Sequence, residues 1–315
     1  MGHDKLRKFA ENETFSCLLQ PSAQELLADG YFHLRDHAVK GRWQDRFGNG
    51  NPLVLELGCG KGEYTIALAE RDPERNYVGV DIKGARLWKG AKYATEHALP
   101  NVAFLRTRVE FITAFFAPGE VSEVWLTFSD PQYRSENSRL CSPLFLERYR
   151  SFLRPGGIVH LKTDSRFLHE YALAVCRAND LRILSSTTDL YGSDRGQLPP
   201  ATVATHGLVN GGDPLRSSGG DERSEVVRGQ AAHGAEIDPV VREVQTFYEQ
   251  LFLEQGYPIT YLSFVIDHEG PYVSPKDPEE FDTKAWRAAE GPRQLFGHDS
   301  AETRRQKLHT EEGSV

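Results

Sequence analysis

Short apolar runs and amphipathic segments alternate regularly along residues 53–190. The apolar runs have the composition of buried strands, and the segments between them have helical periodicity. Strands are predicted at residues 53–57, 77–81, 102–106, 123–128, 158–164 and 181–190. Helices are predicted at residues 62–71, 84–98, 109–116, 143–152 and 166–178. This alternation is typical of a parallel sheet with helices on both faces, so we expect an α/β fold.

The alternation stops at Tyr191 and resumes only after a long polar stretch. Residues 192–238 are rich in Gly, Ser, Asp and Arg and contain too little apolar matter to fold alone. This composition favours a disordered insertion over a functional loop. A helix over 240–256 and a strand over 259–267 follow. The predicted organisation is an N-terminal arm and lead-in (1–50), one domain that contains the insertion (51–270) and a polar tail (271–315).

Composition argues against several classes of protein. No window reaches the roughly 18 consecutive apolar residues that a membrane span needs, and the N-terminus lacks the apolar core of a signal peptide. The four cysteines lie far apart without CxxC pairing, so we expect no metal site, no disulfides and a cytoplasmic protein. The net charge of −8 argues against a surface coated in basic charge but allows a local basic patch.

A glycine-rich loop joins the first predicted strand to the first predicted helix. Gly58, Gly60 and Gly62 let the backbone approach a ligand closely. Asp81 ends the next strand, where a carboxylate can accept both hydroxyls of a ribose. The G-x-G-x-G spacing lacks the extra residue of the dinucleotide fingerprint, and Glu56 would repel a pyrophosphate but attract an ammonium group. The pattern therefore favours S-adenosylmethionine as the cofactor.

Asp130 and Pro131 directly follow the strand predicted at 123–128. The carboxyl end of a central strand is where open α/β sheets bind ligands. Pro131 biases the preceding residue toward an extended conformation. We therefore expect the Asp130 carboxylate to face the same pocket as the glycine loop.

These motifs resemble two nested families. LELGCGKGEYT, VGVD and LRPGG-IVHLKTD resemble the class I S-adenosylmethionine-dependent methyltransferases. That family has a Rossmann-like sheet of seven strands, the last of them antiparallel. KLRKFAENETF, FSDPQYR, SPLFLERYRSFLRPGGIVHLKTDS and QTFYEQLFLEQGYPITYL are similar to the bacterial tRNA (guanine-N7)-methyltransferases over most of residues 4–190 and 240–264. The resemblance implies methyl transfer to N7 of a guanine in tRNA, a variable-loop guanosine in that family.

The resemblance also implies roles for individual residues. The catalytic positions are Asp130 and Asp164. The cofactor-binding positions are Glu56, Gly58, Gly60, Gly62, Asp81, Thr107, Arg108 and Asp130. The substrate-binding positions are Arg134, Asp164, Thr246, Phe247, Tyr248 and Glu249, with Thr246 and Glu249 expected to hydrogen-bond the guanine edge. Phosphate contacts are expected from Lys5, Arg7, Lys8, Arg134 and Arg139.

Three departures from the family pattern bear on the substrate. Ser129 replaces the first proline of a Pro-Asp-Pro motif, and Phe247 replaces the basic residue of a Thr-basic-aromatic-Glu motif. Residues 134–139 keep two arginines where the family has a dense basic cluster. Fewer phosphate contacts lower the affinity for tRNA and its dependence on salt.

Other functions remain open at this point. A class I methyltransferase that acts on a small molecule or a protein would suit the acidic charge. A non-catalytic S-adenosylmethionine-binding subunit is opposed by the retained acidic residues, and an NAD-dependent oxidoreductase by the loop spacing. The sequence is compatible with a monomer and with a homodimer.

Overall fold

The structure is a computed structural model that describes residues 2–27, 33–192, 237–275 and 281–290. The expected insertion at 192–238 lies almost wholly outside these ranges. Of the helices within them, none combines the length and apolar character that crossing a membrane requires.

The described strands form a single sheet in the order β1-β4-β3-β2-β5-β6-β8-β7. Its members are β1 (Leu18–Leu19), β2 (Leu53–Leu57), β3 (Asn76–Asp81), β4 (Val102–Arg106), β5 (Val121–Thr127), β6 (Leu153–Thr163), β7 (Ile183–Thr187) and β8 (Thr260–Val265). Neighbours from β1 to β6 run parallel, and β8 pairs antiparallel with both β6 and β7. Strands β2–β8 confirm the predicted α/β sheet with its antiparallel last strand, and the two-residue β1 adds an eighth strand at one edge.

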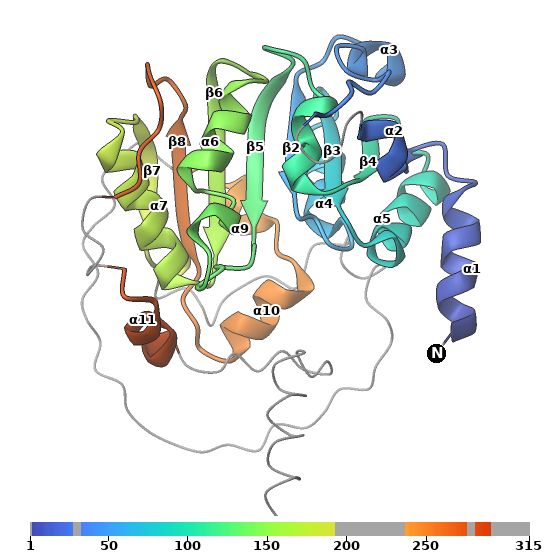
Figure 1. Cartoon of the computed structure of the whole chain (residues 1–315). Helices are drawn as coiled ribbons and strands as arrows, with labels where there is room; N and C mark the ends of the chain where they lie inside the picture. The colour runs from blue at the N-terminus through green and yellow to red at the C-terminus, as the bar shows by residue number, and fades with distance from the viewer. Residues whose placement is uncertain (1, 28–32, 193–236, 276–280, 291–315) are drawn as a thin grey trace, which may run out of the picture.

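Helices cover both faces of the sheet (Figure 1). One apolar core packs the sheet against η1 (Val109–Ala114), α6 (Pro143–Arg150) and α7 (Arg166–Ala178). A second packs the opposite face against α4 (Glu63–Arg71), α5 (Gly84–Glu96), α9 (Val240–Glu243) and α10 (Phe247–Glu254). Because strand side chains alternate between faces, the apolar runs in the sequence supply both cores.

The helix predicted over residues 240–256 is wrong in one respect: the structure divides it into α9 and α10. Thr246 is extended (φ −83°, ψ 160°), and its hydroxyl accepts from the Glu249 N–H while Glu249 accepts from the Thr246 N–H. This reciprocal capping begins a new helix at Phe247. Periodicity missed the break because the apolar spacing continues through it.

The remaining short elements lie at the ends of the sheet and in the tail. They are α1 (Gly2–Asn12), α2 (Ala23–Leu26), α3 (Trp43–Phe47), η2 (Glu136–Ser138) and α11 (Thr283–Glu290). Within the region expected as an arm, α1 packs on α5: the Asn12 amide donates to the Gly84 carbonyl at 3.0 Å, and the Trp88 indole donates to Glu11 at 2.7 Å. Figure 1 shows α1 alongside α5, at the end of the sheet nearest β4.

Candidate functional site

The site residues gather where the parallel strands end. Glycine-loop residues follow β2, Asp81 ends β3, Asp130 follows β5 and Asp164 follows β6. Carboxyl ends of parallel strands meet at one edge of a sheet, where such folds bind ligands. Figure 1 shows α10 and α11 at this edge, toward which the β5 arrow points.

The glycine loop leaves open space beside its backbone. Gly58, Gly60 and Gly62 have φ values of 80°, 59° and 77°, in the left-handed region that favours glycine. A Cβ built at Gly58 or Gly60 would meet nothing within 4 Å, so a ligand can approach there. Asp81 fixes the loop, since its carboxylate accepts from the Gly60 N–H at 3.0 Å and from the Lys83 N–H at 2.7 Å.

Glu56 is a buried carboxylate held by neutral groups. It accepts from the Thr65 N–H at 2.8 Å and from the hydroxyls of Thr65 and Thr127. Burial raises its pKa to about 7. A cation would offset this desolvation, and the ammonium of a nucleoside amino acid is a cation of suitable size.

The residues present therefore fit S-adenosylmethionine. Open space at Gly58 and Gly60 accommodates a ligand against the backbone, and Asp81 at the end of β3 is placed to bind a ribose. Glu56 supplies a carboxylate that accepts hydrogen bonds from neutral threonine groups. Thr107 is buried and donates its N–H to the Asp81 carbonyl at 3.2 Å, which places it beside this acid. Arg108 is exposed, with its guanidinium 3.5 Å from Glu110.

Asp130 lies in a strained loop. Its carboxylate is exposed and accepts from the Gln132 N–H at 2.9 Å. Phe128 and Gln132, on either side, have φ values of 49° and 48°, which non-glycine residues rarely adopt. Such strain often marks functional loops because the surrounding fold must sustain its cost. Arg134 is exposed on the same loop.

Asp164 sits on the neighbouring strand end. The β5–β6 register pairs Thr127 with Lys162, so the loops after both strands start side by side. Asp164 is half-buried, and the next residue, Ser165, caps α7 by accepting from the Leu168 N–H. The sheet register thus places the two expected catalytic aspartates on loops that start from adjacent strands.

The Thr-Phe-Tyr-Glu motif divides into an inner and an outer pair. Glu249 is fully buried, its carboxylate 2.7 Å from the Lys162 ammonium and 2.6 Å from the Tyr191 hydroxyl that donates to it. Burial raises the pKa of Glu249 and lowers that of Lys162. Thr246 is engaged as the helix cap. The outer pair is Phe247 and Tyr248, and the Tyr248 side chain is exposed.

A lysine of the glycine loop lies against this outer pair. The Lys61 ammonium lies 5.5 Å from the Phe247 ring centre and 5.6 Å from that of Tyr248. The Glu63 carboxylate accepts from the Phe247 N–H at 2.9 Å. Lys61 thus supplies a positive charge at the position where Phe247 replaces the family's basic residue, and Glu63 ties α10 to the cofactor loop.

Sequence reasoning missed Lys162, Tyr191, Lys61 and Glu63. Lys162 carried a signal, since it is a charged residue inside a predicted buried strand, directly after Leu161. A lysine with no exposed surface in such a strand needs a carboxylate partner, but only the fold shows that the partner is Glu249.

The basic residues expected at phosphates lie in two places. Arg7 and Lys8 of α1 each lie 5.1 Å from the Trp88 ring, while Lys5 is exposed on the same helix. Arg139 is only 4% exposed, with its guanidinium 4.3 Å from the Tyr171 ring centre. It lies directly after η2, in the segment between β5 and α6.

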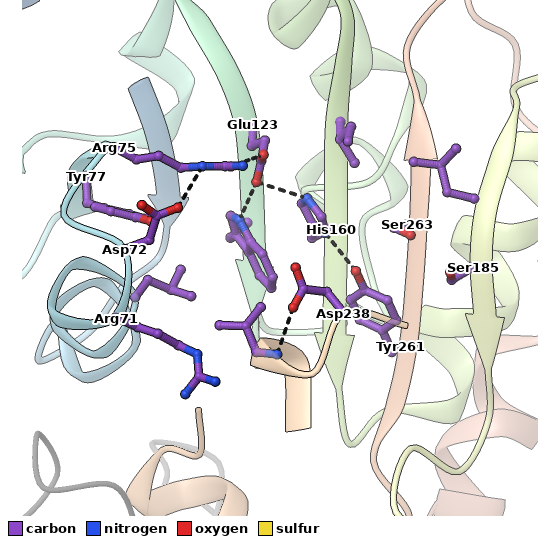
Figure 2. Close-up of a pocket in the computed structure, with 15 residues that line it drawn as sticks. Arg71, Asp72, Arg75, Tyr77, Glu123, His160, Ser185, Asp238, Tyr261 and Ser263 are labelled. Carbon is purple, nitrogen blue, oxygen red and sulfur yellow. Dashed lines mark hydrogen bonds and ion pairs between the residues drawn. The ribbon is translucent and has the colours of Figure 1, made fainter. Parts of the chain in front are cut away.

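A separate hollow of about 530 Å³ opens on the face of the sheet that carries α4 (Figure 2). Glu123 lies at its centre, ion-paired with Arg75 and 3.3 Å from His160, which in turn is 2.8 Å from the Tyr261 hydroxyl. Tyr77 lines it four residues before Asp81, about 13 Å along the strand. This hollow is therefore distinct from the edge site.

The strand order, the glycine loop and the acid at the end of β3 define a class I S-adenosylmethionine-dependent methyltransferase. A family model described as "Putative methyltransferase" matches residues 50–213. The tRNA (guanine-N(7)-)-methyltransferase of Christiangramia forsetii is 42% identical over 266 residues, covering 84% of this chain and 98% of its own length. That of Bacteroides thetaiotaomicron is 39% identical over 283 residues, covering 90% and 93%. The chain belongs to the tRNA (guanine-N(7)-)-methyltransferase family, as the sequence motifs predict.

The similarity to solved structures is lower than the similarity to these relatives. A structure described as an antibiotic-related methyltransferase is 11% identical, with a TM-score of 0.45, over 73% of this chain and 94% of its own.

Proposed function

We propose that the chain methylates N7 of a guanine in tRNA. The observation that carries this proposal is the meeting of the glycine loop, Asp130, Asp164 and the α10 N-terminus at one edge of the sheet. S-adenosylmethionine supplies an electrophilic methyl group on a positively charged sulfur. Glu56, Asp81 and the backbone at Gly58 and Gly60 would hold it.

The chain's own task is to position the base. Guanine N7 carries a lone pair and no proton, so the site needs no general base. Holding two reactants about 3 Å apart and in line can remove several kcal/mol from a barrier. The Lys61-backed ring of Tyr248 offers an exposed aromatic face for this, since bases taken out of a stack commonly lie on aromatic side chains.

The two aspartates would stabilise the positive charge that develops on the purine. A purine methylated at N7 becomes cationic, and a nearby carboxylate stabilises that charge as it forms. Asp130 is exposed on a loop whose flanking residues Phe128 and Gln132 have positive φ, while Asp164 stands on the adjacent strand end. We assign both a catalytic role, and Arg134 a contact to the RNA backbone.

We assign a positioning role to the inner pair of the Thr-Phe-Tyr-Glu motif, Thr246 and Glu249. Glu249 and Thr246 set the start of α10, and Lys162 anchors Glu249 from β6, two residues before Asp164. The geometry therefore links the outer pair to the strand that carries a catalytic aspartate.

The test is methyl transfer from labelled S-adenosylmethionine to unmodified bulk tRNA, followed by nucleoside analysis. We expect label in 7-methylguanosine. Label in another nucleoside would contradict the N7 assignment. Binding of the cofactor product without any label in tRNA would favour a small-molecule or protein substrate.

A further inference from the structure

Glu290, at the end of α11, sits on the N-terminus of α7. Its carboxylate accepts from the Phe167 N–H at 2.6 Å, from the Ser165 hydroxyl at 3.1 Å, and from the Tyr133 hydroxyl. Helix α7 spans 13 residues, and the positive end of its dipole favours an anion at this point. Three donors from two separate segments thus converge on one anionic group.

A buried guanidinium packs on the same Phe167, and the Glu136 carboxylate is also near, since it accepts from the Tyr171 hydroxyl. Arg139 is 96% buried, its guanidinium lying 4.8 Å from the Phe167 ring centre and 4.3 Å from that of Tyr171. Its Nε is buried and has no hydrogen-bond partner in the described part of the chain. A buried guanidinium is costly unless an anion stands near it. It is a second observation, independent of the helix end, that points to an anionic ligand.

The site adjoins the expected catalytic residues. Ser165 directly follows Asp164, and Tyr133 lies three residues after Asp130 on the same loop. Tyr133 also stacks on Phe167 with their ring centres 4.9 Å apart. An RNA that brings a guanine to Asp130 and Asp164 must place its backbone close to these donors.

Helix α11 lies on the surface, and its described contacts to the rest of the fold include those of Glu290 and Trp286. It has no buried residue, and Trp286 packs on Phe167 at 5.9 Å between ring centres. A phosphate matches a carboxylate in charge and in acceptor oxygens, so it can replace Glu290 on the same donors.

We propose that Tyr133, Ser165 and the Phe167 N–H form a binding site for a backbone phosphate of the RNA substrate, which Glu290 fills in the free protein. This inference rests on the proposed function. Binding of tRNA displaces α11, and Glu290 acts as a built-in competitor.

The experiment compares Glu290→Ala with wild type and with Glu269→Ala, which removes an equal charge from an exposed position. We expect Glu290→Ala to lower the Kd for unmodified tRNA about threefold to tenfold, the range that helix-end charges support, and Glu269→Ala to leave it unchanged. In the Glu290→Ala background, Tyr133→Phe should weaken tRNA binding again.

Hydrogen exchange supplies a readout that a purely structural cap would not move. Adding tRNA to the wild type should speed exchange of the amides at 283–290 and keep the Phe167 amide protected. Equal Kd values for Glu290→Ala and wild type, or slower exchange at 283–290 on binding, would overturn the proposal. If wild type labels tRNA at N7 while either result holds, only this inference fails; if it neither binds nor labels tRNA, the proposed function fails with it.

Discussion

At the scale of single residues, the edge site depends on carboxylates in contrasting environments. Asp130 is exposed and keeps only a turn contact, whereas Glu56 is buried among neutral donors. Asp81 lies between these extremes, fixing the backbone of the loop that it faces. Environment, rather than residue type, therefore separates a group suited to stabilising charge in the reaction from one suited to binding a cation.

Asp130→Asn should lower the rate of methyl transfer about a hundredfold or more, because it removes the negative charge that faces the methylated purine. The free energy of unfolding should change by less than about 0.5 kcal/mol, since the side chain is exposed. Single-turnover rates and urea unfolding measure the two quantities. Near-wild-type turnover would remove Asp130 from the mechanism.

Glu56 should couple cofactor binding to proton release. Its pKa is raised to about 7 in the folded protein, so near pH 7 about half of the molecules hold a proton that a bound ammonium would displace. Affinity for S-adenosylhomocysteine should therefore rise between pH 6 and pH 8. Calorimetry in two buffers of different ionisation enthalpy measures the proton release. Glu56→Gln should abolish it, and equal heats in both buffers for the wild type would refute the coupling.

The same shift has a defined sign for stability. The folded state binds the proton of Glu56 more tightly than the unfolded state, in which a glutamate has its ordinary pKa of 4.5. This contribution to the free energy of unfolding is therefore present below pH about 4.5. It is lost as the pH rises to about 7, by about 3 kcal/mol.

At the scale of elements, the start of α10 connects the separate parts of the site. Thr246 and Glu249 cap each other, Glu249 pairs with Lys162 of β6, and Glu63 of α4 accepts from the first N–H of α10. One helix end thus connects the cofactor loop, the sheet and the exposed Tyr248 ring.

Thr246→Ala should lower the free energy of unfolding by about 1 kcal/mol, the usual cost of losing an N-cap hydroxyl. Thr246→Ser keeps the hydroxyl and should restore most of it. Urea denaturation with all three proteins measures the effect. A Thr246→Ala protein as stable as wild type would show that the hydroxyl serves only the substrate.

At the scale of the whole molecule, a chain of ion pairs and a hydrogen bond connects the segment after α4 with strands β5, β6 and β8. Arg75, Glu123, His160 and Tyr261 connect segments far apart in sequence (Figure 2). Hydrogen bonding from His160 and the charges of His160 and Arg75 lower the pKa of Glu123 to about 2 despite its burial. This network stabilises the face of the sheet that α9 and α10 leave open.

Glu123 should make the fold sensitive to acid. Because its pKa is lower in the folded state than the ordinary glutamate value of 4.5, its contribution to stability is present above pH about 4.5 and is lost as the pH falls toward 2. The full pKa shift corresponds to about 3 kcal/mol of the free energy of unfolding. Glu123→Gln should flatten the decrease in unfolding free energy between pH 5 and pH 3, measured by urea titration. An unchanged pH profile would contradict this assignment.

The sequence by itself determined the α/β sheet, and the resemblance carried by its motifs indicated the family and the antiparallel last strand. Short apolar runs, helical stretches between them, and a glycine loop followed by Asp81 are local patterns that can be recognised directly in the sequence. The placement of Asp130 and Asp164 at strand ends follows from the same reasoning.

Only the tertiary structure decided which partners these residues meet. Lys162 and Glu249 are 87 positions apart, and Tyr133 and Glu290 are 157 apart. Such pairs form because folding the sheet brings distant strand ends and helix ends to one edge, where buried charges and orphan helix N–H groups must find partners. Tertiary contacts also fix the start of α10 after the break from α9. Lys162 pairs with Glu249 of the Thr246 cap, and Glu63 accepts from the Phe247 N–H.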